Sequence, residues 1–384
     1  MLLTLGLGKN DYLNLFRPMT MKKLLYLLVF LVGATCAQAQ LTERLDSLLA
    51  ADREVGFNGN VLLSHGDSIR YVRSLGLADA ASGQLLTEQS VFDLGSVSKQ
   101  FTALSIVQLV EAGKLTFATE VGEVIEGFPY AGITVGHLLR HQSGLPDYMG
   151  LMMNKKNWDP KKIATNDDAI ELLRRLQPPL LFPVGTEYSY SNTGYLLLGS
   201  IIERVAGMEY GEYLEQNVFL SAGMSDTHVY RRRYRPEMVE KGTEGHMYQE
   251  KKNRFVRVEK YKSLREYYYL DGIVGDGMVN STLRDLEKWK VALRTNRLIS
   301  AASMELMLTP DEVSPEYGYG LYIKDSDEYG RRIYHGGRWG GYLSMTYYEP
   351  LDNLFIVILC NAEYDGFTNL LVRLRKIFRE ESGG

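Results

Sequence analysis

Segments typical of β-strands stand at both ends of this chain, and segments typical of helices fill its middle. Near the start, residues 60–64 and 69–72 are apolar and partly alternating, and the turn-forming Gly66-Asp67 pair separates them. After Ser314 the chain returns to short runs rich in aromatic and β-branched residues. These runs are 317–323, 331–334, 341–348 and 354–359. The order predicts an α+β fold with one antiparallel sheet built from both chain ends, flanked by helices, and a mostly helical insertion between.

Helical spacing of apolar residues marks the middle of the chain. It is clearest in residues 99–113, where Phe101, Leu104 and Val107 share a face and Gly113 is the stop signal. Similar patterns occupy 135–140, 167–176, 194–205 and 284–293, and an amphipathic helix is expected over 367–380. We therefore place the helical subdomain at about 100–313 and the sheet at about 56–94 together with 314–384.

The first 39 residues have the composition of an export signal. Residues 21–23 (Met-Lys-Lys) are a basic start, 24–32 form a short apolar core, and 37–39 (Ala-Gln-Ala) match a cleavage site. We predict a leader over residues 1–39, with Met21 as an alternative start, and a mature chain exported to the periplasm or secreted. After cleavage we expect no stable membrane insertion.

Cysteine usage and net charge bear on whether the chain carries a lipid anchor, a disulfide framework or a nucleic-acid surface. Lipid attachment at Cys36 is the less favoured reading of the leader, because Thr35 is unusual before a lipidated cysteine. Cys360 is then alone, which excludes an internal disulfide framework. The net charge of −4 gives no general attraction to nucleic acid. The basic stretch 231–266 interleaves acidic residues, so we interpret it as a solvated, irregular surface lobe.

A serine and a lysine three residues apart open the helix at 99–113. Ser96 and Lys99 would be neighbours on one helical face, and no other Ser-x-x-Lys occurs in the chain. Burial lowers the pKa of a lysine, and the neutral amine can accept the hydroxyl proton of a serine that attacks a carbonyl. The spacing alone is a weak signal, and Ser96 as a plain helix cap is the competing reading.

Two further motifs follow in order: Tyr190-Ser191-Asn192, and His335-Gly336-Gly337 at the end of a predicted strand. With them the chain resembles the serine β-lactamase and penicillin-binding-protein superfamily. It is most similar to the branch of class C enzymes, D-alanyl-D-alanine carboxypeptidases and esterases. Flanking segments carry the likeness across about residues 56–377; they are 95–103, 137–146, 192–199 and 317–320.

The resemblance implies a single serine hydrolase domain over residues 40–384, with a role for each motif. Ser96 would be the nucleophile and Lys99 its activator, while Tyr190, its pKa depressed by nearby cations, would act as base and then as acid. Asn192 would orient the scissile group. The strand His335-Gly336-Gly337 would lie beside the nucleophile, with Gly337 allowing close approach, and the backbone N–H of Arg338 would complete the oxyanion hole with that of Ser96.

One departure bears on the substrate. Many β-lactamases carry Lys-Thr-Gly at the third motif, where this chain has His335, which is only partly charged at neutral pH. Arg338 is a candidate source of the missing charge. The pattern favours an exported serine hydrolase that forms a Ser96 acyl-enzyme from a D-amino-acid peptide, a small ester or, weakly, a β-lactam. The alternative is a sensor or scaffold that binds penicillin or peptidoglycan peptide without turnover.

Some features remain open or point elsewhere. His137 and His141 are spaced like a zinc pair, but they belong to the family-like segment 137–146, so we predict neither a metal site nor a cofactor. Asp276 either lines the site or caps the next helix. The expected partner is a small-molecule or peptide substrate, not a nucleic acid, and the sequence is silent on oligomeric state.

Overall fold

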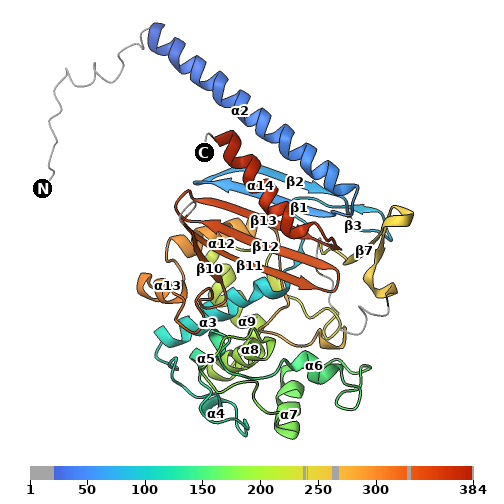
Figure 1. The fold of residues 1–384 in the computed structure, drawn as a ribbon, viewed down its shortest axis with the longest axis vertical. Helices are drawn as coiled ribbons and strands as arrows, with labels where there is room; N and C mark the ends of the chain where they lie inside the picture. Colours follow the sequence, from blue (N-terminus) through green and yellow to red (C-terminus); the bar gives the residue numbers. More distant parts are fainter. Residues whose placement is uncertain (1–20, 237–238, 240, 262–267, 327–329, 383–384) are drawn as a thin grey trace, which may run out of the picture. The chain divides into compact units, whose positions relative to one another are not determined.

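A six-stranded antiparallel sheet organises the protein, in the order β10-β11-β12-β13-β1-β2 (Figure 1). The computed structural model describes residues 21–236, 239, 241–261, 268–326 and 330–382. The sheet strands are β1 (Gly59–His65), β2 (Ser68–Leu75), β10 (Tyr322–Ser326), β11 (Gly330–Trp339), β12 (Tyr342–Glu349) and β13 (Leu354–Cys360). The predicted α+β class, with a sheet assembled from both chain ends, is confirmed.

The two chain ends meet at the pairing of β1 with β13. Gly59 pairs with Cys360 and Val61 with Ile358 in an uninterrupted antiparallel register. Every residue of β13 is buried, as is all of β1 except His65. Runs of apolar and β-branched residues suit such a doubly covered position, which explains why these strands read as continuous apolar segments.

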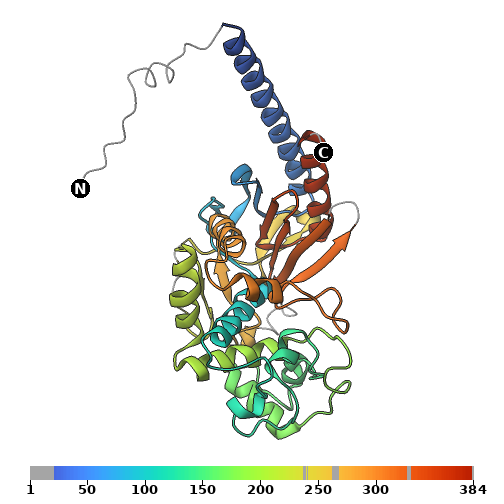
Figure 2. The ribbon, with the colours of Figure 1, turned by 90° about the vertical axis from the view of Figure 1, so that its left-hand side faces the viewer.

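The helical insertion gathers below the sheet in both views (Figures 1 and 2). Its centre is α3 (Lys99–Glu111), which packs on α8 (Asn192–Ala206), while α12 (Leu283–Arg294) contacts β1 and β13. Phe101 joins these layers, because its ring centroid lies 4.4 Å from that of Trp289 and 5.5 Å from that of Phe219. The predicted helices at 99–113, 135–140, 167–176, 194–205 and 284–293 are all present, within a few residues at each end.

The remaining helices and short helical turns are α4 (Val121–Val124), α5 (Val135–Leu139), α6 (Tyr148–Met153), α7 (Asn166–Leu176), α9 (Tyr210–Leu214), η2 (Glu215–Phe219), α10 (Leu220–Ala222), η3 (Glu250–Lys252), η4 (Val258–Lys260), η5 (Tyr268–Leu270) and α13 (Ala301–Met307). The other short strands are β3 (Leu77–Asp79), β4 (Gln84–Leu85), β7 (His246–Gln249), β8 (Arg254–Arg257) and β14 (Ala362–Glu363).

A second, three-stranded sheet of order β5-β9-β6 combines one strand that precedes α3 in the chain with two that follow it. It consists of β5 (Phe92–Asp93), β9 (Val279–Ser281) and β6 (His228–Val229), all antiparallel. Because β5 ends three residues before Ser96 and β9 ends just before α12, this sheet connects the start of α3 with the α12 side of the insertion.

Two local predictions were wrong. The expected strand over 317–323 begins only at Tyr322, because Gly320 adopts a φ of +73° and packs its backbone against Lys99 and Gln100 of α3. The stretch 231–266, expected to be an irregular lobe, contains the β7–β8 hairpin, and β14 pairs with β7 in parallel. Residues 237–238, 240 and 262–266 of that stretch lie outside the described residues.

The described chain divides into two compact units: residues 49–372, and the residues up to 48 with those from 373 onward. In the second unit, Arg44 of α2 (Met21–Arg53) pairs with Glu380 and Glu381 of α14 (Phe367–Ser382) at 2.6 and 2.5 Å. The helix predicted over 367–380 is thus confirmed.

Helix α2 runs unbroken through the predicted cleavage site at 37–39, and the leader stays a prediction. No helix within the described ranges is both long enough and apolar enough to cross a lipid bilayer.

Candidate active site

Ser96 occupies an accessible position in an otherwise buried segment. It lies in a single 3-10 turn, η1 (Gly95–Ser98), that leads directly into α3, and it is the one residue between 91 and 100 that is not buried. Strand β9 holds this turn from both sides, because Leu94 N donates to Val279 O at 2.9 Å and Val279 N donates to Ser98 Oγ at 3.1 Å. The serine hydroxyl is therefore presented on a rigid turn.

Lys99 lies fully buried beneath Ser96. Its Nζ donates to Ser96 Oγ at 3.0 Å, to Asn192 Oδ1 at 2.9 Å and to the carbonyl oxygen of Asp276 at 2.8 Å. Burial lowers the pKa of Lys99 to about 8, although the carboxylates of Asp276 and Asp147 oppose the shift. The predicted contact with Ser96 is present, and a substantial fraction of the amine is neutral at mildly alkaline pH.

Tyr190 also reaches the nucleophile, but its acidity differs from the prediction. Its hydroxyl hydrogen-bonds the Ser96 side chain, and Lys99 Nζ lies 5.0 Å from its ring centroid. Burial raises the pKa of Tyr190 well above its usual value, and Asp276 and Asp147 raise it further, against the effect of the Ser96 hydrogen bond. The prediction of a depressed pKa for Tyr190 was wrong. It assumed two cations beside the hydroxyl, whereas the hydroxyl is buried and two carboxylates lie near it.

His141 supports the loop that carries Tyr190. Its backbone adopts a φ of +57°, its Nδ1 accepts from Ser191 N at 3.1 Å, and its carbonyl accepts from Ser189 N at 3.0 Å. Its ring centroid lies 4.3 Å from that of Tyr190. The sequence connected His141 with the family-like segment 137–146 but did not predict that it supports the loop of Tyr190. Within the part of the chain that the structure describes, no three His, Cys, Asp or Glu side chains converge as metal ligands.

Asn192 is held in place by a residue that sequence reasoning missed. While its Oδ1 accepts from Lys99, its Nδ2 donates to Asp147 Oδ2 at 2.9 Å, and its backbone N donates to the same oxygen at 3.1 Å. Asp147 also caps α6 by accepting from Met149 N at 2.9 Å. The available signal was a capping-type aspartate directly after the segment 137–146.

The third motif forms a strand edge beside the nucleophile. Strand β10 pairs with β11 only up to Tyr334, so among the described strands none pairs with that edge from His335 to Trp339. A Cβ on Gly95 would lie 2.7 Å from Arg338 N, and one on Gly337 would overlap the carbonyl oxygen of Leu94. The backbone N–H of Arg338 thus lies next to the turn that carries Ser96, as the oxyanion prediction requires.

His335 is neutral in this setting. Its ring nitrogens contact Gly336 O at 2.7 Å and the Tyr317 hydroxyl at 3.3 Å. Burial, reinforced by the charge of Lys99, lowers the pKa of His335 to about 3. The expectation of partial charge at neutral pH was therefore wrong, and His335 supplies shape and hydrogen bonding but no cation.

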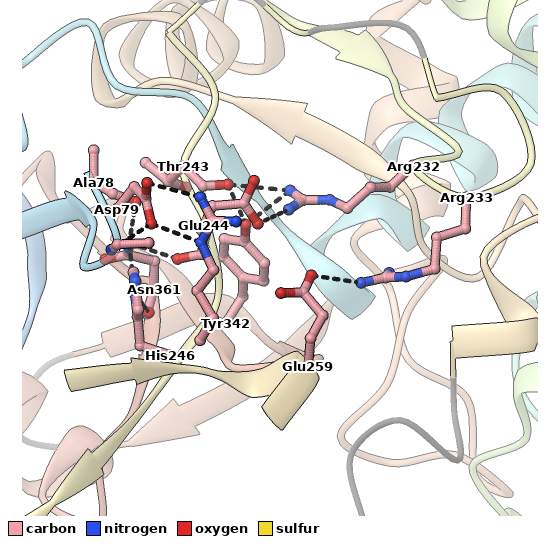
Figure 3. Close-up of polar contacts among 12 residues, drawn as sticks. Ala78, Asp79, Arg232, Arg233, Thr243, Glu244, His246, Glu259, Tyr342 and Asn361 are labelled. Carbon is pink, nitrogen blue, oxygen red and sulfur yellow. Dashed lines mark hydrogen bonds and ion pairs between the residues drawn. The ribbon is translucent and has the colours of Figure 1, made fainter. Parts of the chain in front are cut away.

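The arginines near this edge are already engaged. The Arg338 side chain is 71% exposed and pairs with Glu363 at 2.5 Å. Arg232 pairs with Glu244 at 2.9 Å, and Arg233 with Glu259 at 3.1 Å (Figure 3). Arg232 also donates to the Tyr342 hydroxyl and Arg233 to Asp271. The charges of Arg338, Arg232 and Arg233 are thus each paired with a carboxylate.

Asp276 lines the site and does not cap the next helix. Its carbonyl accepts from Lys99, and its Oδ2 accepts from the Tyr148 hydroxyl at 3.0 Å. The cap of α12 is Thr282, whose side chain accepts from Asp285 N at 3.2 Å. The alternative that the sequence left open is thereby decided.

Comparisons with known proteins agree with this arrangement. The model of the family described as Beta-lactamase matches residues 45–376. Penicillin-binding protein 4* of Bacillus subtilis is 39% identical over 313 residues, which cover 80% of this chain and 69% of that protein. A D-aminopeptidase of Brucella ovis is 25% identical over 316 residues, and the match spans 80% of this chain but only 55% of that protein. The crystal structure of a penicillin binding protein from Bacillus halodurans superposes with a TM-score of 0.75 at 28% identity, covering 87% of this chain and 98% of that one.

Proposed function

The chain belongs to the Beta-lactamase family, and on that premise we propose that it is a serine hydrolase that cleaves an ester or amide through an acyl-enzyme on Ser96. The observation that carries this proposal is the contact between Lys99 Nζ and Ser96 Oγ at 3.0 Å, with the lysine buried and the serine accessible. A buried amine with a pKa near 8 is suited to accept a proton from a serine at working pH.

In the proposed acylation step, neutral Lys99 takes the Ser96 hydroxyl proton while Ser96 Oγ bonds to the substrate carbonyl carbon. The carbonyl oxygen gains negative charge, which the backbone N–H groups of Ser96 and Arg338 stabilise. Tyr190, which stays neutral because its pKa is raised, donates its proton to the leaving group, and the proton that Lys99 took from Ser96 replaces it. Water then attacks the ester carbonyl, with the same groups acting in reverse.

The charge distribution favours a substrate that has no carboxylate beside the scissile bond. His335 is neutral, Arg338 is paired with Glu363, and Lys99 is occupied by three acceptors. The carboxylates of Asp147 and Asp276, which raise the pKa of Lys99, add negative charge near the nucleophile. We therefore rank D-aminoacyl amides and small esters above β-lactams. A relative whose name is D-aminopeptidase supports this ranking.

Export remains part of the proposal and rests on the leader-like residues 1–39. It is tested by N-terminal sequencing of protein recovered outside the cytoplasm, where we expect a chain that begins at Gln40. Recovery of the full chain from the cytoplasm alone would contradict it.

The central experiment follows both product and protein mass. Purified chain is incubated with p-nitrophenyl acetate, D-alanine p-nitroanilide or nitrocefin, and intact mass is recorded over time. Turnover without lasting adduct supports the hydrolase, whereas a stable adduct without product supports the penicillin-binding sensor. The Ser96→Ala variant should lose both label and turnover. A matched control is Ser105→Ala in α3, the helix that follows the Ser96 turn, since that hydroxyl donates to Phe101 O of the same helix. Full activity in Ser96→Ala would overturn the assignment.

A further inference from the structure

The loop that carries Asp276 is fixed between the two helices that bear the catalytic motifs. Gly275 has a φ of +100°, and a Cβ there would overlap the carbonyl oxygen of Tyr195 in α8. From the other side, Thr102 of α3 donates its hydroxyl proton to Gly275 O at 2.6 Å. The position of Asp276 is thus set by the same elements that set Lys99 and Asn192.

Asp276 makes two separate contacts with its two polar groups. Its backbone carbonyl accepts from Lys99 Nζ at 2.8 Å, and its side-chain Oδ2 accepts from the Tyr148 hydroxyl at 3.0 Å. Tyr148 is the first residue of α6 and directly follows Asp147, which holds Asn192. The start of α6 therefore steadies the two residues, Asn192 and Asp276, that accept from Lys99 besides Ser96.

We propose that Asp276 is a positioning residue for Lys99: its carbonyl aims the amine at Ser96, and its carboxylate, oriented by Tyr148, governs how readily that amine releases its proton. The inference deepens the proposed function and rests on it, since it assigns to Lys99 the role of proton acceptor. Because the two contacts use different atoms, the carboxylate can be removed while the carbonyl stays.

The surroundings of Lys99 single out the two carboxylates as its charged neighbours. Burial lowers the pKa of Lys99. The carboxylates of Asp276 and Asp147 raise it, as does the Tyr322 hydroxyl. The rings of Tyr190 and Tyr195 lie 5.0 and 5.6 Å from Nζ. Lys99 also lowers the pKa of His141 and His335, both of which burial already keeps neutral. The Asp147 carboxylate accepts three protein N–H groups, whereas Asp276 offers its carboxylate to Tyr148.

The test compares Asp276→Asn with the parent chain across pH 5 to 10. Removing the anion destabilises protonated Lys99, so the acid limb of kcat/KM for p-nitrophenyl acetate should move about one unit toward lower pH. A merely structural role would lower activity without moving the limb, and an unmoved limb would overturn the proposal. Tyr148→Phe should move the limb in the same direction by a smaller amount. This variant replaces Asp276→Asn as the test if Asp276→Asn fails to fold.

The matched control is Asp271→Asn. Asp271 is a buried carboxylate five residues earlier, and it engages Arg233 and Trp339 instead of Lys99. In this variant the acid limb of kcat/KM should stay at the parental pH, even if the variant is less stable than the parent chain. A shift in this variant equal to that in Asp276→Asn would show that the effect is not specific to Lys99, and would contradict the proposal.

A second measurement separates this inference from the proposed function. The full chain, with 13C-labelled lysine, is titrated by NMR, and the Lys99 resonance is identified by its loss in Lys99→Arg. The pKa of Lys99 should fall in Asp276→Asn whether or not any substrate is turned over. A shift without turnover would defeat the hydrolase proposal alone, and turnover without a shift would defeat the role of Asp276 alone.

Discussion

The Arg338 guanidinium donates to the Glu363 carboxylate at 2.5 Å, so this residue offers the site its backbone N–H while its charge is engaged by β14. The pair is partly exposed, with 71% of the arginine side chain accessible and 11% of the glutamate. An exposed pair of this kind is weakly coupled and can be opened by substitution.

Opening that pair should change substrate preference. In Glu363→Gln the arginine is released, and we expect KM for the carboxylate-bearing nitrocefin to fall by about two- to five-fold, the range of an exposed ion pair. KM for the uncharged p-nitrophenyl acetate should stay the same. Equal changes for both substrates would contradict the prediction, since charge would then not be the cause.

The rate of acylation should follow the deprotonation of Lys99. Since its pKa is about 8 and the neutral amine is the active form, kcat/KM should rise with pH through that value and fall about ten-fold per pH unit well below it. Lys99→Arg, which carries a permanently charged guanidinium, should lose at least about 10³-fold in acylation. Stopped-flow release of p-nitrophenol measures both. A flat profile from pH 6 to 9 would exclude Lys99 as the base.

The contact between β11 and the nucleophile turn predicts a sharp difference between two neighbouring glycines. An alanine at Gly337 would meet the backbone of Leu94 and the Ser344 hydroxyl, so Gly337→Ala should cost about 1–3 kcal/mol in the free energy of unfolding. At Gly336 the nearest atom is the flexible end of Met345, 3.3 Å away, and Gly336→Ala should cost less than about 1 kcal/mol. Urea unfolding measures the difference, and equal costs would contradict the packing described here.

Stability should depend on pH through His335. Its pKa is about 3 in the folded chain and about 6.5 when unfolded, so between these values only the unfolded chain binds the proton. The free energy of unfolding is therefore lost as pH falls from about 6.5, by up to about 1.4 kcal/mol per pH unit for this group. His335→Asn should flatten the dependence between pH 7 and 4, measured by urea unfolding at each pH. Parallel curves for the two chains would contradict the buried, neutral state.

Much of the fold could be predicted because its strands and helices are long and regular. Strands β1 and β13 are nearly continuous apolar runs, and α3 has a clear apolar stripe before Gly113. The error at 317–323 arose from aromatic residues that read as a strand. There, a left-handed glycine turns the chain against α3, which a local pattern does not reveal.

The site could be predicted only in part. Ser96 and Lys99 are close in sequence, so their contact follows from helix geometry. Asp276 approaches Lys99 from 177 residues away, and Asp147 approaches Asn192 from a different loop. Without these carboxylates, the sequence led to a depressed pKa for Tyr190. Burial and long-range charge reversed that direction, and neither can be read from a motif.

The three acceptors around Lys99 Nζ have a consequence for where hydrogens reside. A protonated amine has three protons and can serve Ser96 Oγ, Asn192 Oδ1 and the Asp276 carbonyl at once. A neutral amine has two, and amide and peptide oxygens cannot donate, so both remaining protons stay with Asn192 and Asp276. The amine lone pair then faces Ser96, and the bond between them reverses, with the hydroxyl as donor. Loss of one proton from Lys99 thereby orients the serine for attack without moving a heavy atom.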